Sequence, residues 1–172
     1  MYALISNNQI TEIGELQKLF PNEIQPTHLY AIQHGALPIL DGNREDEKFY
    51  WVTFDKYTIE TDVVKRNYVN TPKALNDVTE TPQGQTEALT TKGLKSQYIS
   101  QFKHTANLLL SSTDWVVIRK AERNVNIPAE IATKRAAIIA ECDRLTNAVN
   151  AAQNMPAFIS AVQSANWNNN VE

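Results

Sequence analysis

The segment Leu94–Val149, LKSQYISQFKHTANLLLSSTDWVVIRKAERNVNIPAEIATKRAAIIAECDRLTNAV, decides the fold of the second half of the chain. In its first part apolar side chains recur at steps of three and four residues, at Leu94, Tyr98, Phe102, Ala106 and Leu109. In its last part a second stripe has the same kind of spacing. Its residues are Ile131, Ile138, Cys142, Leu145 and Val149, with Ile139 beside them. Such spacing is typical of one face of an α-helix. Because neither helix can bury its stripe alone, we predict that the two pack as an antiparallel hairpin.

A shorter helix is predicted between the two long ones. Residues 111–114 are four candidate N-cap residues in a row. Trp115, Ile118 and Ala121 follow at helical spacing, which favours an inward position for these three side chains. The β-branched run 116–118 would also suit a strand.

Arg135 lies in register with Cys142 and Val149, on the inward stripe of the second long helix. A charge in that position either extends to solvent from the edge of the stripe or finds a partner of opposite charge. Both alternatives stay open in the sequence. If a carboxylate partner exists across the hairpin, Asp114 is the first candidate.

Residues 1–70 are predicted to form a small α+β domain around an antiparallel meander of about four strands. The predicted strands are residues 2–5, 9–13, 49–59 and 62–70, the first two joined by an Asn-Asn turn. A short helix is predicted over 15–20 and a single helical turn before Gly35. Pro38 is expected to interrupt any regular element that follows. The aromatic start of the third strand predicts cover on both of its faces.

The composition changes after residue 70. Residues 79–92 are polar and rich in threonine, so they bury too little apolar surface to offset the entropy of ordering them. We predict a linker at 71–92 and a helical hairpin or bundle at 93–172. Asn154 is the expected cap of a last helix, in which Phe158, Ile159 and Val162 face inward, and the tail 168–172 is expected to fray.

The overall composition is that of a globular chain whose small net charge creates no strong electrostatic field. The chain has 172 residues, a formal net charge of −3 and 42% hydrophobic residues. A mildly acidic chain does not attract phosphates, so nucleic acid is not an expected partner. The single cysteine, Cys142, cannot form an intrachain disulfide and is expected to pack as a small apolar residue. No apolar run is long enough for a membrane span, and no secretory signal is expected.

No catalytic or metal-binding pattern stands out. The three histidines, His28, His34 and His104, do not lie at metal-ligand spacing, and five glycines leave no phosphate-binding loop. The acidic group formed by Asp41 and residues 45–47 lacks the alternating ligands of a calcium loop, so a solvated loop is favoured. We therefore predict that the chain is not an enzyme and holds no cofactor or metal.

Aromatic residues are concentrated in the predicted hairpin of strands 49–59 and 62–70. They are Tyr50, Trp51, Phe54, Tyr57 and Tyr68. Core packing is the favoured interpretation. A binding surface is the alternative, because tryptophan and tyrosine are enriched at the energetic centres of interfaces.

The helical half carries a series of short motifs in order. These are Leu108-Leu109-Leu110, Thr113-Asp114-Trp115, Ile127-Pro128 and Lys134-Arg135-Ala136-Ala137-Ile138. Together they resemble bacteriophage tail-fibre assembly and tail-associated proteins, which have a basic helix, a leucine pair, Asp-Trp, a proline and an Arg-containing helix. The opening residues 1–5, the helix end at 19–22 and the stretch 64–75 are similar to the first part of the same family.

The resemblance implies a non-enzymatic protein of a phage tail that binds tail-fibre or baseplate proteins. We favour a structural or adaptor component; a transient tail-fibre assembly chaperone, absent from the mature virion, is the alternative. The implied location is the host cytoplasm during assembly and, for a retained component, the virion tail. A homo-oligomer is left open, as is a small ligand-binding domain or enzyme that uses the N-terminal sheet. The candidate partner-binding or structural residues are Trp51, Tyr57, Asp114, Trp115 and Arg135.

Overall fold

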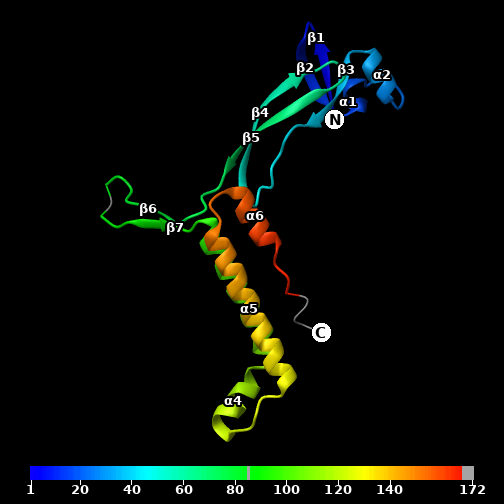
Figure 1. The fold of residues 1–172 in the computed structure, drawn as a ribbon. Coiled ribbons are helices and arrows are strands. Elements are labelled where there is room, and N and C mark those ends of the chain that lie inside the picture. Colours follow the sequence, from blue (N-terminus) through cyan, green and yellow to red (C-terminus); the bar gives the residue numbers. More distant parts are fainter. Residues whose placement is uncertain (85, 168–172) are drawn as a thin grey trace. The chain divides into compact units, whose positions relative to one another are not determined.

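The computed structural model describes residues 1–84 and 86–167 and divides into two compact units, residues 1–72 and 73–172 (Figure 1). The first unit joins a curled β-sheet to two short helices. The second unit combines a small hairpin with four helices among its described residues. The predicted α+β class, with helices gathered in the C-terminal half, is confirmed.

A five-stranded sheet forms the first unit. Its strands are β1 (Tyr2–Ser6), β2 (Gln9–Gly14), β3 (Ala36–Asp41), β4 (Tyr50–Ile59) and β5 (Val64–Pro72). The predicted hairpins β1–β2 and β4–β5 are confirmed, the first with Asn7 and Asn8 at positive φ in its turn. The strand order is β2-β1-β3-β5-β4, and β3 runs parallel to β5. The predicted antiparallel meander is therefore wrong, because an unexpected central strand makes the sheet mixed.

That unexpected strand contains Pro38, which we expected to interrupt regular structure. Ile5 N donates to Gly35 O at 2.8 Å and Ile39 N donates to Met1 O at 3.0 Å. These bonds leave Pro38, opposite Tyr2, at a non-hydrogen-bonded position toward β1. Pairing of β3 with β5 begins only at Ile39. The missing N–H of the proline thus removes no bond from either ladder.

Two short helices complete the first unit, α1 (Leu16–Leu19) and α2 (His28–Gln33). Both were predicted. Thr27 caps α2 by accepting a hydrogen bond from Tyr30 N at 3.2 Å. The small core beneath them contains Leu19, Ala31 and Ala36, with Tyr2, Leu4, Leu16 and Phe20 packed against it.

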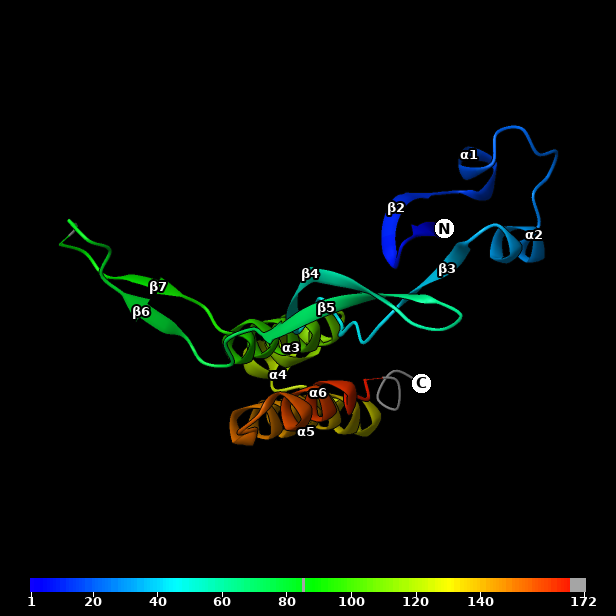
Figure 2. The ribbon, with the colours of Figure 1, turned by 90° about the horizontal axis from the view of Figure 1, so that it is seen from above.

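The segment 71–92, for which we predicted a linker, contains a two-stranded hairpin of β6 (Val78–Glu80) and β7 (Leu89–Thr91) (Figure 2). All six strand residues are exposed. The hydroxyls of Thr79 and Thr90 hydrogen-bond across the pair at 2.9 Å. Cross-strand threonine pairs and β-branched residues each contribute a small amount to the stability of such a ladder. Low hydrophobicity therefore predicted the exposure of this segment but not its backbone structure.

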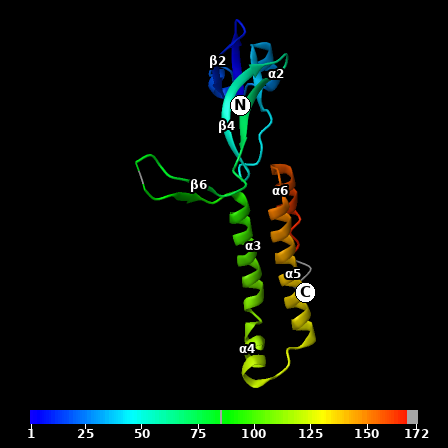
Figure 3. The same cartoon turned by 60° about the vertical axis from the view of Figure 1, so that its left-hand side comes forward.

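The helices of the second unit follow the predicted pattern. They are α3 (Leu94–Ser111), α4 (Asp114–Arg123), α5 (Ala129–Ala151) and α6 (Met155–Gln163). Figure 3 shows α3 and α5 side by side, as the hairpin prediction requires. Their buried residues are Leu94, Phe102, Ala106, Ile138, Leu145 and Val149. All six belong to the two predicted stripes.

Helix α6 covers part of this hairpin. Asn154 caps it, as predicted, by accepting from Ala157 N at 2.9 Å. Phe158 is fully buried and meets Tyr98 edge to face, with ring centroids 5.4 Å apart. The expected fraying of 168–172 lies outside the described residues. Through the part of the chain that the structure describes, no helix combines the length and apolarity that crossing a bilayer requires.

Candidate functional site

The inward arginine of α5 is the centre of the site. Arg135 Nη2 lies 2.9 Å from Asp114 Oδ1, and Nη1 donates to Leu110 O at 2.9 Å and to Thr113 Oγ1 at 2.7 Å. The Arg135 side chain is only 17% exposed, whereas that of Asp114 is half exposed. The predicted ion pair is thus confirmed, and the alternative of an arginine extended to solvent is wrong. We call Leu110, Thr113, Asp114 and Arg135 the arginine clasp.

The clasp determines how α3 gives way to α4. Thr113 donates to Leu110 O twice, from its backbone nitrogen at 3.0 Å and from its hydroxyl at 3.0 Å. Carbonyls at a helix end lack intrahelical partners. Here the carbonyl of Leu110 accepts a hydrogen bond from the guanidinium of Arg135 on the opposite helix. A planar guanidinium can donate to several acceptors at once. A single residue of α5 therefore holds both the end of α3 and the start of α4.

Helix α4 presents apolar residues outward, in contrast to our prediction. Trp115 is 55% exposed and Ile118 is 56% exposed, and Ala121 is also exposed, whereas Val116 is fully buried. The buried residue, Val116, is one position away from both Trp115 and Val117, so the packed face of α4 differs from the face that the spacing of residues 115, 118 and 121 predicts. The guanidinium of Arg119 stacks over the Trp115 ring at 4.8 Å.

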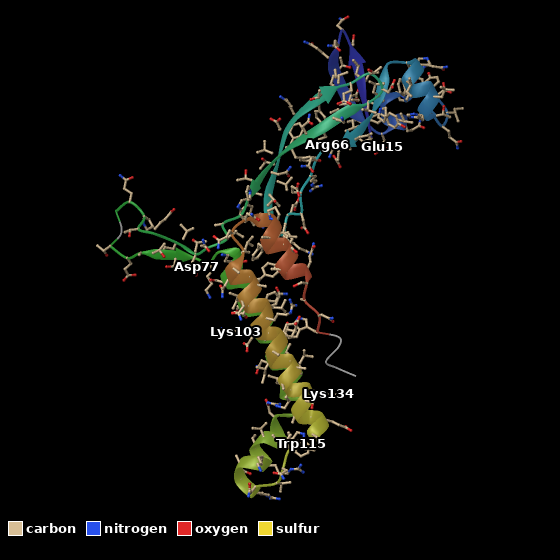
Figure 4. All side chains as sticks on the ribbon, viewed as in Figure 1. Glu15, Arg66, Asp77, Lys103, Trp115 and Lys134 are labelled. Carbon is tan, nitrogen blue, oxygen red and sulfur yellow. The ribbon has the colours of Figure 1, made fainter. Side chains whose placement is uncertain are left out.

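A cavity of about 340 Å³ opens beside the clasp, between the end of α3 and the start of α5. Its walls are mostly apolar and include Leu108, Leu109, Ile131 and Ile138, with Lys134 among its other lining residues. Figure 4 shows Trp115 and Lys134 at this end of the helical unit. Sequence reasoning missed the cavity, because the apolar stripes predict which faces of the two helices pack together but not where along their length the helices separate.

The other two candidate residues belong to the first unit. Trp51 is 64% exposed and Tyr57 is partly buried, with its ring 4.9 Å from that of Phe54. Phe54 is itself 53% exposed. Core packing is therefore the wrong interpretation for Trp51 and Phe54, and the start of β4 is not covered on both faces. The structure brings Asp114 and Arg135 together, with the exposed Trp115 next to Asp114 in sequence, while Trp51 and Tyr57 lie on β4.

The acidic loop near β3 is engaged in ordinary polar contacts. Tyr68 Oη donates to Asp41 Oδ1 at 2.7 Å, and Arg66 Nε lies 3.5 Å from the same oxygen. Glu47 pairs with Arg44. In residues 1–84 and 86–167, no three His, Cys, Asp or Glu side chains gather closely enough to hold a metal ion.

A second polar cluster joins α5 to the end of α6. Glu141 accepts from Arg144 Nε at 2.7 Å and from Asn166 N at 2.9 Å, and Arg144 Nη2 donates to Ser164 O at 2.8 Å. Its hydrogen bonds with Arg144 hold the pKa of the Glu141 carboxyl below its usual value, against the opposing effect of burial. This cluster is structural in its geometry, because each group has a partner within the helical unit.

No protein family, curated protein or solved structure matches this chain. The resemblance of its motifs to phage tail proteins therefore stays a prediction.

Proposed function

We propose that this chain is a non-enzymatic bacteriophage tail protein that acts by binding tail-fibre or baseplate proteins, as a structural or adaptor component or as an assembly factor. The observation that carries the proposal is the arginine clasp. The Arg-containing helix of the family-like pattern meets both the leucine run and Asp-Trp in this one cluster, although Arg135 is 25 residues from Leu110 and 21 from Asp114 in sequence. Because these motif residues contact one another, their joint occurrence in the sequence has a structural basis.

The exposed apolar surface supports a binding role. Beyond the clasp, Trp115, Val117 and Ile118 on α4 are each more than 40% exposed. Leu108, near the end of α3, is 59% exposed. Single exposed apolar residues are ordinary, but several together at one end of a helical unit are typical of protein-binding surfaces. The described residues offer no converging set of ionisable groups that would instead favour catalysis.

A nonsense codon early in the gene, in a phage that encodes this chain, tests the proposal. We expect particles with missing or incomplete fibres or baseplates, seen by electron microscopy, and rescue by the wild-type chain supplied from a plasmid. Complete, infectious tails in the absence of the chain would refute it.

Mass spectrometry of purified particles and of infected-cell lysate then separates the two forms of the proposal. A fixed copy number in particles means a structural or adaptor component, which we favour. Presence in lysate alone means a transient chaperone.

A further inference from the structure

The groove between α3 and α5 is filled along only part of its length. Helix α6 occupies the part near the start of α3, where Phe158 packs on Tyr98. The far end of α6 is fixed beside the middle of α5, where Asn166 N donates to Glu141 Oε1 at 2.9 Å. Helix α6 therefore runs antiparallel to α5 and reaches the level of Glu141.

The cavity beside the clasp continues the same strip of both long helices. On α5, Ile138, Lys134 and Ile131 follow Glu141 at steps of three and four residues, so they share its face. On α3, Leu109 and Ser112 continue the face of Tyr98 in the same way. A different shallow cavity, which includes Lys103 and Ile139, uses other faces of the two helices.

The chemistry of the open part indicates what it binds. Helix α6 shows that this strip accepts an apolar helix, since MPAFISAVQ contains no charged residue. The charged residues that line the cavity are Lys134 and Arg135, and its lining includes no aspartate or glutamate, although the whole chain is acidic. Arg135 is already paired with Asp114, whereas Lys134 has no ion-pair partner among the described residues.

We propose that this open part of the groove binds an apolar helix of a partner protein that carries carboxylates beside its apolar face, and that the bound helix continues the line of α6. Helix-in-groove binding needs an apolar seam, and charges at its edge select the partner. That the partner is a tail protein rests on the proposed function, whereas the chemistry of the groove does not depend on it.

A designed helix tests the groove without any phage component. The probe is a fluorescent synthetic helix of about four turns, with leucines at heptad positions a and d and glutamates at e and g. Its counterpart carries lysines at e and g. Fluorescence anisotropy with the full chain should show saturable binding of the glutamate helix, at least about tenfold tighter than that of the lysine helix.

Matched variants locate the binding surface. We expect Leu108→Asp to weaken binding of the glutamate helix by about tenfold or more, and Lys134→Glu by about fivefold or more. The controls Ile139→Asp and Lys103→Glu make the same chemical changes at the other cavity, and both should change the affinity less than about twofold. Circular dichroism of every variant should show the wild-type helix content.

Several results would overturn the proposal. One is the same affinity for both probe helices, and another is equal losses in the groove and control variants. A wild-type dimer that Leu108→Asp dissociates would assign the groove to a second copy. If a chain that ends at Trp167 binds the probe much more tightly, the groove binds residues 168–172 of the full chain and not a partner. Because the probe is synthetic, these results leave the nonsense-codon test of the proposed function independent.

Discussion

Replacing Arg135 by alanine should destabilise the helical unit more than any single change at the exposed surface of α5. The substitution removes three hydrogen bonds, to Leu110 O, Thr113 Oγ1 and Asp114 Oδ1. The bonds to the two neutral acceptors contribute about 1 kcal/mol each. The ion pair contributes at most about 1 kcal/mol, because Asp114 is half exposed. We therefore expect a loss of about 2–3 kcal/mol in the free energy of unfolding.

The partial variants apportion this loss. Asp114→Asn should cost less than about 1 kcal/mol, since it leaves the bonds to the neutral acceptors in place. Arg135→Lys should cost an intermediate amount, because an ammonium keeps the charge but cannot reach three acceptors as a planar guanidinium does. Lys134→Ala, beside it on the same helix, is the control and should lie within about 0.5 kcal/mol of the wild type, since Lys134 is exposed.

The assay is urea unfolding of the full chain, followed by circular dichroism for the helices and by tryptophan fluorescence. Hydrogen exchange adds local information, and the amides of α4 should lose protection first in Arg135→Ala. If Arg135→Ala unfolds at the same urea concentration as Lys134→Ala, the clasp does not stabilise the fold and the reasoning is wrong.

Three further changes test other contacts. Gly93→Ala should destabilise the unit by more than about 2 kcal/mol in urea unfolding, because an added Cβ would lie 2.3 Å from Asn76 O. The pKa of Glu141 is lowered in the fold, so its contribution to stability is present above the unfolded-state pKa of about 4.3 and is lost as the pH falls through the lower folded value. Glu141→Gln should remove that part of the pH dependence of unfolding, and an unchanged profile would contradict the assignment. Asn154→Ala removes the cap of α6 and should lower stability by about 1 kcal/mol, whereas an unchanged melting temperature would show that the cap is dispensable.

The long helices were predictable because their signal is local. The stripes that contain Phe102 and Leu145 follow a strict period, and burying them requires only that the two helices meet. The inward register of Arg135 identified Asp114 as its first candidate partner, but the sequence alone could not decide between that ion pair and an arginine extended to solvent.

The remaining features depend on contacts distant in sequence. Pro38 fits into β3 because its neighbours pair at other positions, which cannot be read from the proline itself. Which face of α4 is packed, with Val116 buried and Trp115 exposed, depends on tertiary contacts and cannot be read from the apolar spacing of this helix alone. The open groove beside α6 arises from the unequal lengths of packed helices, nine residues in α6 against 23 in α5.

Binding of the purified full chain to the purified tail-fibre and baseplate proteins of the same phage tests the central proposal most directly. Biolayer interferometry should show saturable binding to at least one of these proteins, and Leu108→Asp should weaken it while Ile139→Asp should not. Binding that neither change weakens would refute the groove as the binding site but would leave the proposed function standing. The absence of binding to every tail protein, with the chain folded as judged by circular dichroism, would contradict the proposed function.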